Sequence, residues 1–430
     1  MDVPRRTCAR RWVCSAAVTI AACALTTARG EDWPSFRGPT GQGISSEKGL
    51  PTRWSASENI AWKTAIPGEG WSSPIVRKGR VFVTATTDGG VSCHLICLDQ
   101  ATGKILWDKE VHRQKPLRKE TRNSYATSTP AADGKRVYAV FADGAIVAVD
   151  FEGRVEWTNR DVHFYGQHGL GTSPLLYRDL LIVSFDGSSK TGDKTVGWQK
   201  PWEKSFVLAL DRASGKERWR AKRGPSRIAH TTPTILQVDG RDQLLSNAGD
   251  VIQGFDPGSG RRLWSVRSEG EGVVPSPVCG EGLVFTTSGF GSPAVRAVRP
   301  GDGAGRDAKI VWQEKRAVPM IPSMLYAKPY LFTISQDGFA QCLTAATGES
   351  VWRERVGGSY SASPIWADSK LYLLADNGDT TILDAGPKFR VLARNAIGEH
   401  CQASLAASAG QLFLRTEKHL FCIGAKDAKR

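Results

Sequence analysis

The sequence predicts an all-β protein, an eight-bladed β-propeller, from three observations. A three-part phrase recurs roughly every 40 to 60 residues: Ser/Thr-Pro with an apolar strand, then Asp before a Thr/Ser-Gly turn, then Trp four residues after the glycine. Forty-five glycines separate short runs of strand-forming residues. One further Trp stands before the first copy. Four-stranded propeller blades have this repeat length.

Seven copies can be counted inside the chain. The clearest runs from Ser73-Pro74 through Leu98-Asp99 and Thr102-Gly103 to Trp107. The others open at Thr129-Pro130, Ser173-Pro174, Thr232-Pro233, Ser276-Pro277, Ser323-Met324 and Ser363-Pro364, and all but the last close at a Trp: Trp157, Trp219, Trp264, Trp312 and Trp352. The fifth copy has an expanded turn between Gly301 and Asp307, and the seventh has lost its turn glycine and its Trp.

An eighth unit opens at Ala403-Ser404-Leu405 and stops before any closing Trp. The missing residue stands at the other end of the chain, where Trp62 precedes the first blade without a blade of its own. We therefore expect the N-terminal strand to complete the last blade and close the ring, which removes two exposed sheet edges. The expected organisation is a signal peptide at 1–30, an N-terminal extension at 31–58, the propeller at 59–425 and a tail at 426–430.

Each blade follows from ordinary strand and turn chemistry. Runs such as 80–85 and 370–374 have strand composition. The Asp of each Asp-x-x-Thr-Gly segment is expected to bond nearby backbone amides, while the glycine supplies a positive φ. The Trp that follows buries a large apolar area. Its recurrence at one blade position predicts a ring of Trp side chains wedged between neighbouring blades.

Residues 1–30 read as a secretory signal, with four arginines before a short apolar stretch from Trp12 to about Ala22. That stretch is too short to span a membrane, so no transmembrane helix is expected in the mature chain. Cleavage after Ala28-Arg29-Gly30 competes with a lipobox at 20–23 that would make Cys23 a lipidated N-terminus. The expected location is periplasmic or secreted, with lipid anchoring at Cys23 as the alternative.

The chain is basic, with a formal net charge of +14. Removal of 1–30 takes away five Arg and one Asp, so 52 basic and 42 acidic residues remain, a formal charge of +10. Such a surface suits an envelope protein or an anionic polymer or membrane surface as partner, and equally a solvated surface without a ligand. A basic cluster lies at 113–122. No nucleic-acid-binding signature is present, so no nucleic acid partner is expected.

Six cysteines remain in the mature chain, and export permits disulfides. Cys93 and Cys97 are too far apart on one strand to pair without a turn or bulge. Cys401 and Cys422 share the composite blade and are the better-placed pair. No Cys-x-x-Cys motif occurs, and no zinc site is expected.

The blade phrase resembles the pyrroloquinoline-quinone (PQQ)-like propeller repeat from about Asn59 to Ile423. The segments 32–39 (Asp-Trp-Pro-Ser-Phe-Arg-Gly-Pro) and 168–174 (His-Gly-Leu-Gly-Thr-Ser-Pro) look like a bacterial secreted group of these proteins. One branch of the family comprises quinoprotein dehydrogenases, which use PQQ with calcium on the propeller axis. Another comprises non-catalytic eight-bladed propellers, among them the outer-membrane β-barrel assembly factor.

The resemblance implies a non-catalytic scaffold or binding module of the cell envelope, with outer-membrane protein assembly as the role of the similar propeller. The chain has no adjacent Cys-Cys pair, and the calcium ligands and catalytic Asp of the dehydrogenases match no motif here. A PQQ-dependent dehydrogenase oxidising an alcohol or sugar, with PQQ and calcium as cofactors, remains the alternative. A carbohydrate-binding propeller is the second alternative.

Geometry indicates where a ligand would bind, because the first strand of each propeller blade lines the central channel. Aligned on the Ser-Pro dipeptide, the residue three before its second member gives a ring: Trp71, Thr127, Gly171, His230, Val274, Ile321, Ser361 and Gln402. The candidate cofactor-binding residues at this mouth are Trp71, Tyr125, His168, His230, Tyr360, His400 and Gln402. The alternative is that they only plug and hydrate the channel. No catalytic residue and no metal ligand is assigned.

Two features of one insertion are less specific. Residues 186–193 are rich in oxygen ligands and have some calcium-loop character without the required spacing. Trp198 and Trp202 follow, and an exposed aromatic insertion would be a partner contact. The alternative is that the insertion folds back over its blade.

Overall fold

The computed structural model describes residues 1–2, 30–190, 193 and 195–425. Those residues form eight antiparallel four-stranded sheets, as predicted, and the seventh carries β1 as a fifth strand. Among them, no helix is long and apolar enough to cross a membrane. Most of the predicted signal peptide (residues 3–29, with Cys23) and the tail at 426–430 lie outside the described residues.

The sheets follow one another along the chain. The first four blades contain β3 (Ile75–Arg77), β4 (Arg80–Thr87), β5 (Ser92–Asp99), β6 (Ile105–Arg113); β7 (Ala131–Ala132), β8 (Arg136–Val140), β9 (Ile146–Asp150), β10 (Val155–Asn159); β11 (Leu175–Tyr177), β12 (Leu180–Phe185), β13 (Phe206–Asp211), β14 (Glu217–Lys222); and β15 (Thr234–Val238), β16 (Arg241–Asn247), β17 (Val251–Phe255), β18 (Arg262–Arg267). A short 3-10 turn, η1 (Asp88–Gly90), lies between β4 and β5.

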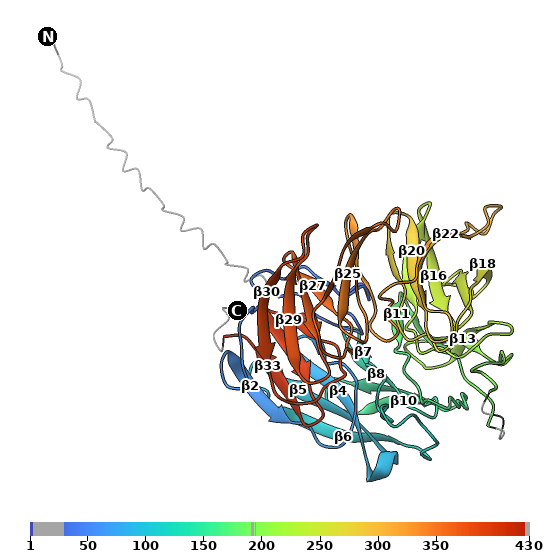
Figure 1. Cartoon of the computed structure of the whole chain (residues 1–430). Helices are drawn as coiled ribbons and strands as arrows, with labels where there is room; N and C mark the ends of the chain where they lie inside the picture. Colours follow the sequence, from blue (N-terminus) through green and yellow to red (C-terminus); the bar gives the residue numbers. More distant parts are fainter. Residues whose placement is uncertain (3–29, 191–192, 194, 426–430) are drawn as a thin grey trace.

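The remaining blades close the ring. They contain β19 (Val278–Gly280), β20 (Leu283–Ser288), β21 (Ala294–Arg299), β22 (Lys309–Glu314); β23 (Leu325–Ala327), β24 (Tyr330–Ile334), β25 (Phe339–Thr344), β26 (Ser350–Arg355); β27 (Ile365–Ala367), β28 (Lys370–Leu374), β29 (Asp379–Asp384), β30 (Val391–Ala396) with β1 (Ile44–Ser45); and β31 (Ala406–Ser408), β32 (Gln411–Arg415), β33 (His419–Ile423) with β2 (Ile60–Ala65). Figure 1 shows β2 beside β33. The predicted closure by the N-terminal strand is confirmed.

The predicted Trp ring is also confirmed, and its hydrogen bonds join the blades. The indole N–H groups of Trp62, Trp107 and Trp157 donate to backbone carbonyls of the following blade, at 2.9, 2.9 and 3.2 Å. A register shift before each Trp turns its side chain toward that neighbour. Each seam therefore combines burial of an indole with a hydrogen bond.

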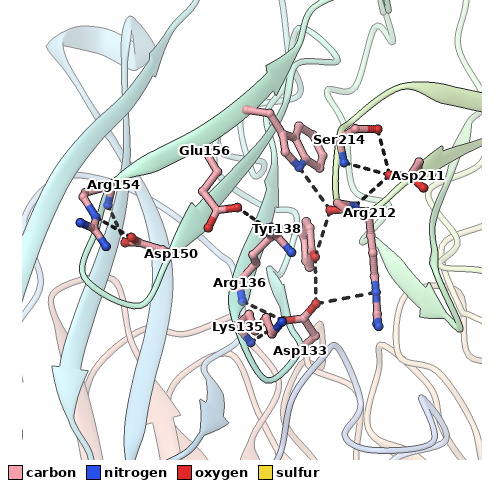
Figure 2. Close-up of polar contacts among 12 residues, drawn as sticks. Asp133, Lys135, Arg136, Tyr138, Asp150, Arg154, Glu156, Asp211, Arg212 and Ser214 are labelled. Carbon is pink, nitrogen blue, oxygen red and sulfur yellow. Dashed lines mark hydrogen bonds and ion pairs between the residues drawn. The ribbon is translucent and has the colours of Figure 1, made fainter.

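The seam between the second and third blades shows this pattern in detail (Figure 2). The Arg212 carbonyl accepts the Tyr138 hydroxyl at 3.2 Å as well as the Trp157 indole. The Asp211 carboxylate accepts the backbone N–H of Ser214 at 2.9 Å, which is the Asp-anchored turn expected from the sequence. This turn presents its carbonyl to the preceding blade because Asp211 holds the hairpin closed.

Two seams depart from the pattern, and both departures have a local cause. The expanded turn of the fifth blade makes Trp264 bond the Gln243 side chain at 2.7 Å, and Gln243 then reaches Gly301 at 2.9 Å. The seventh blade lacks a closing Trp, and Trp54 of the extension is buried in one hydrophobic cluster with residues of that blade such as Tyr372 and Ile382. The Trp54 backbone N–H donates to Asn395 on β30 at 2.9 Å, which holds the extension against this outer strand.

The inner strands are joined by a second ring that the sequence analysis did not anticipate. In every blade, the backbone N–H of the Ser or Thr that opens the repeat donates to the side-chain hydroxyl of the equivalent residue in the next blade. The eight distances lie between 2.9 and 3.0 Å and return from Ser404 to Ser73. We call these residues the hydroxyl ring: Ser73, Thr129, Ser173, Thr232, Ser276, Ser323, Ser363 and Ser404.

Strand directions give the propeller two different faces. Because successive strands of a blade run antiparallel, the inner strands all begin at one face, here the mouth face, and the first turns lie at the other, the floor face. The extension crosses the floor side: Trp33 pairs with Val76 of the first blade, Gln42 reaches Thr234 of the fourth blade across the ring at 2.8 Å, and β1 then pairs with β27 of the seventh.

The turn glycines make a testable contribution to the seams. A Cβ on Gly103 would lie 2.4 Å from Cδ2 of Trp62, and φ is +71°. We expect Gly103→Ala to cost about 1–2 kcal/mol for the backbone and about 1–3 kcal/mol for the clash. Urea unfolding followed by tryptophan fluorescence measures this loss.

Gly79→Ala is the matched control for that change. Gly79 has φ +74° and nothing within 4 Å of an added Cβ. Gly79→Ala should therefore lower the free energy of unfolding only by the cost of the left-handed backbone conformation. Equal losses in the two variants would contradict the role assigned to the glycine–indole contact.

Candidate functional site

The propeller axis holds a cavity of about 400 Å³ that opens toward the mouth face. All eight positions of the ring aligned from the sequence line it, from Trp71 around to Gln402. Six members of the hydroxyl ring form the next layer inward, and Phe36 of the extension lines the cavity as well. Since the extension lies on the floor side, the axial space is a blind pocket rather than an open channel.

Four of the seven candidate residues line this cavity: Trp71, His168, His230 and Gln402. The ring centroids of His168 and His230 are 6.0 Å apart at 77°. Gly171 lies beside His230, where an added Cβ would approach the His230 Cβ to 2.9 Å. The absence of a side chain at Gly171 thus leaves room for His230 at the cavity wall.

The other three candidates, Tyr125, Tyr360 and His400, are not among the cavity-lining residues. Tyr125 donates its hydroxyl to the Leu117 carbonyl at 2.6 Å within the loop after the first blade. Tyr360 precedes β27 and is buried in the core, whereas its neighbour Ser361 lines the cavity. His400 is exposed, with its ring 5.4 Å from Trp71, behind the cavity wall.

Two aromatic residues of the mouth come from loops that the alignment could not place. Trp198 stacks edge-on against His168 at 4.8 Å and lies 5.8 Å from Phe290. An added Cβ on Gly272 would lie 2.4 Å from the Trp198 ring. The insertion between β12 and β13 of the third blade therefore folds back over the mouth, and Trp198 belongs to the cavity wall rather than to a free surface.

The two carboxylates of the oxygen-rich segment 186–193 are bonded to different protein groups. The Asp186 carboxylate is buried and forms a bidentate ion pair with Arg223, with Arg223 Nη2 at 2.9 Å. Asp193 instead accepts from Thr195 and from Lys200, the latter at 3.0 Å. Both carboxylates thus bond protein groups, not a common metal position.

Cys401 and Cys422, the better-placed pair of cysteines in the sequence, are not joined in the structure. All six cysteines of the described residues are free thiols, five of them buried. Burial raises the pKa of Cys401 to about 12. These thiols act as small apolar core groups.

The electrostatics of the cavity wall are set by burial. Burial lowers the pKa of His230 to about 3, with a smaller contribution from His168, although part of His230 faces the cavity. Burial also lowers the pKa of His168, while the nearby Glu120 opposes that shift. Both imidazoles are therefore neutral at pH 7. The Nδ1 atom of His168 is buried without a hydrogen-bond partner.

A quinone–calcium centre was the alternative implied by the resemblance, and the residues present do not fit it. Calcium requires several oxygen ligands, carboxylates above all. Glu120 is the one carboxylate among the cavity-lining residues, and it pairs with Arg122 at 3.5 Å. In the described part of the chain, no group of three His, Cys, Asp or Glu side chains could hold a metal ion.

Comparison with known proteins gives a consistent family. The family model described as outer membrane protein assembly factor BamB matches residues 44–160, 94–222, 196–320 and 294–388. BamB of Burkholderia pseudomallei is 26% identical over 261 residues, which cover 54% of this chain and 64% of that protein. The match thus spans less than two thirds of the relative's length.

Two solved structures share the fold. The crystal structure of BamB from Moraxella catarrhalis superposes with a TM-score of 0.58 at 14% identity, covering 87% of this chain and 99% of the other. The computationally designed protein Ika8 gives 0.61 at 12% identity, covering 84% and 98%. At these identities the superpositions establish the architecture alone.

The neutral state of His230 has a consequence for stability. Its pKa in the unfolded chain is near 6.5 and its folded pKa is near 3, so the unfolded state takes up a proton first as the pH falls. The stability that His230 contributes is therefore present above pH 6.5 and is lost between about pH 6.5 and pH 3. We expect wild type to lose up to about 1.4 kcal/mol more per pH unit than His230→Gln, measured by urea unfolding between about pH 7 and pH 5.

The exposed His163 offers the comparison for that experiment. His163→Gln should follow the wild-type pH profile. A His230→Gln profile parallel to wild type would show that the imidazole titrates normally in the folded protein.

Proposed function

Because this chain belongs to the family of the outer membrane protein assembly factor BamB, we propose that it is a non-catalytic scaffold of the cell envelope that acts in outer-membrane protein assembly. The observation that carries the proposal is the family match over residues 44–388 in four overlapping ranges. These ranges follow the blades around the ring, so the likeness extends over the repeats rather than over one motif. The activity and partners of the whole relative are part of this proposal.

The architecture supports a scaffold. A closed ring of hydrogen bonds at the axis and buried indoles at most seams join neighbouring blades, so loops on the mouth face project from a stiff base. The absence of a fitting quinone–calcium donor set among the cavity-lining residues removes the main argument for the dehydrogenase alternative. A rigid body with variable loops is a common way to build a binding module.

The contact surface that we propose is the loop at 113–123, with the insertion at 188–204 beside it. Both segments connect strands on the mouth face. His168 links them: its backbone carbonyl accepts the Asn123 side chain of the loop at 2.7 Å, and its ring packs against Trp198 of the insertion. Lys119 lies 5.2 Å from the Tyr125 ring, and Arg118 is exposed. A basic loop fixed to a rigid ring suits an acidic partner surface.

The proposed location follows from the same family and from the N-terminus. We place the mature protein in the periplasm at the outer membrane. Cleavage before Glu31 would release it, whereas lipidation of Cys23 would anchor it. Mass spectrometry of the mature N-terminus separates these two forms.

Neutralising the loop tests the contact surface. We expect Arg118→Gln, Lys119→Gln and Arg122→Gln together to leave the fold intact, because the three side chains lie at the surface of one loop. In a strain that depends on this chain, the variant should lower the amount of folded outer-membrane protein several-fold. Heat-modifiability gels of the envelope fraction measure that amount.

The matched control removes equal charge from the opposite face. Lys104, Lys216 and Arg261 are exposed in hairpin turns on the floor face. Their triple change to Gln should leave outer-membrane protein levels at the wild-type value. An equal loss of folded outer-membrane protein in both variants would point to net charge rather than to the loop. A strain that lacks the whole chain and still has wild-type levels of folded outer-membrane protein would overturn the proposed function.

A further inference from the structure

The hydroxyl ring has unused hydrogen-bond donors. A hydroxyl group can accept hydrogen bonds and donate one, and each ring hydroxyl accepts the backbone N–H of the preceding blade. Within the described residues, no hydrogen bond gives these eight hydroxyls an acceptor for their own protons. All eight residues are more than nine-tenths buried. Six of them line the axial cavity: Ser73, Thr129, Ser173, Ser323, Ser363 and Ser404.

Two buried arginines lie next to this ring without a carboxylate. Arg37 donates from Nη2 to the Met324 carbonyl at 2.5 Å, and its Nε and Nη1 atoms are buried without partners. Arg415 donates to the carbonyl and hydroxyl oxygens of Ser72, at 3.2 and 2.5 Å. Met324 follows Ser323 and Ser72 precedes Ser73, so each guanidinium bonds a residue that is next in sequence to a member of the hydroxyl ring.

The third fully buried arginine shows how this protein otherwise compensates such a charge. Arg223 is paired with Asp186, and both side chains are 0–1% exposed. Neither Arg37 nor Arg415 has an ion pair among the described residues, and each is 2% exposed. A buried charge without a counter-charge is costly. Neither guanidinium lines the cavity, but both add uncompensated positive charge to the buried layer behind the hydroxyl ring.

The cavity wall contributes little negative charge of its own. Glu120 is the one acidic lining residue, and Arg122 beside it offsets that charge. The other polar lining groups are hydroxyls, amides and the two neutral imidazoles. Convergent donors with nearby buried cations form a positive, partly water-excluded site, which is the chemistry that binds oxyanions.

We propose that the axial cavity binds a small molecule bearing a carboxylate or phosphate group, whose oxygens accept hydrogen bonds from the hydroxyl ring. The aromatic mouth, formed by Trp71, Trp198 and Phe290, would hold the remainder of the ligand. A volume of about 400 Å³ lies within the usual range of small-molecule sites. This site goes beyond the proposed scaffold function and does not depend on it.

Isothermal titration of the purified mature chain tests the site with three probes: citrate, inorganic phosphate and neutral glucose. We expect saturable one-to-one binding of citrate or phosphate, weakened by added salt, and no binding of glucose. Binding of citrate without binding of phosphate would identify a carboxylate ligand, and the reverse result would identify a phosphate ligand. Glucose binding without anion binding, or no anion binding up to about 1 mM, would overturn the proposal.

Variants assign any binding to the ring. The double change Ser323→Ala and Ser363→Ala removes two cavity hydroxyls and should lower the affinity for the anion at least tenfold. The double change of the same residues to Thr keeps both hydroxyls and should retain most of the wild-type affinity. Ser408→Ala is the matched control, because the Ser408 hydroxyl also accepts from a neighbouring blade, at 3.3 Å from Gln100, and does not line the cavity. Arg37→Met provides a second test if the alanine variant fails to fold. Wild-type affinity in a folded alanine or methionine variant would contradict the site.

Discussion

The closed ring of hydrogen bonds at the axis is the constraint on which the architecture depends. Each backbone N–H of the ring has one acceptor, the hydroxyl of the next blade, and the last blade must reach the first at 3.0 Å. Such a ring ties every inner strand to its two neighbours at one spacing and ties the last blade to the first. It also satisfies buried backbone donors where the inner strands begin, before any sheet ladder can do so.

The outer seams then follow from that inner geometry. Blades held at fixed spacing leave a wedge between neighbours that widens outward, and a Trp fills it at nearly every seam. The turn glycine of the following blade has no side chain because the indole occupies that position, as at Gly215 against Trp157. Where the seventh blade lost its Trp, Trp54 of the extension joins the same core. Burial of a large apolar side chain is thus kept while its source in the sequence changes.

The sequence predicted the fold well because the repeat phrase records these seams. The Trp, the Asp turn and the turn glycine each have one structural role, and an unmatched Trp62 was sufficient to predict closure. The hydroxyl ring also left a signal: Ser323 and Ser404 keep the hydroxyl residue in units where the following proline has been lost. That difference indicates that the hydroxyl, rather than the proline, is the required group.

The candidate site could be predicted only in part. Alignment on the inner strands placed all eight positions of the first ring on the cavity wall, since those residues follow the repeat. It failed for Tyr125, Tyr360 and His400, which all lie in connections between strands, and Tyr360 is buried in the core. Trp198 and Phe290 reach the mouth from irregular connections, which carry no periodic signal in one sequence.

The N-terminal extension determines whether the space along the propeller axis is open at one face or at both. A propeller without it would have a channel open at both faces, through which water would solvate any ion along the axis. Here residues 33–45 contact inner strands of the first, fourth and seventh blades, Phe36 lines the cavity, and Arg37 is buried next to Phe36 in the sequence. The same segment therefore supplies the floor, a positive charge and the exclusion of water. A purely structural plug would need only the first of these, and an apolar residue at position 37 would bury its side chain without the desolvation penalty of a guanidinium.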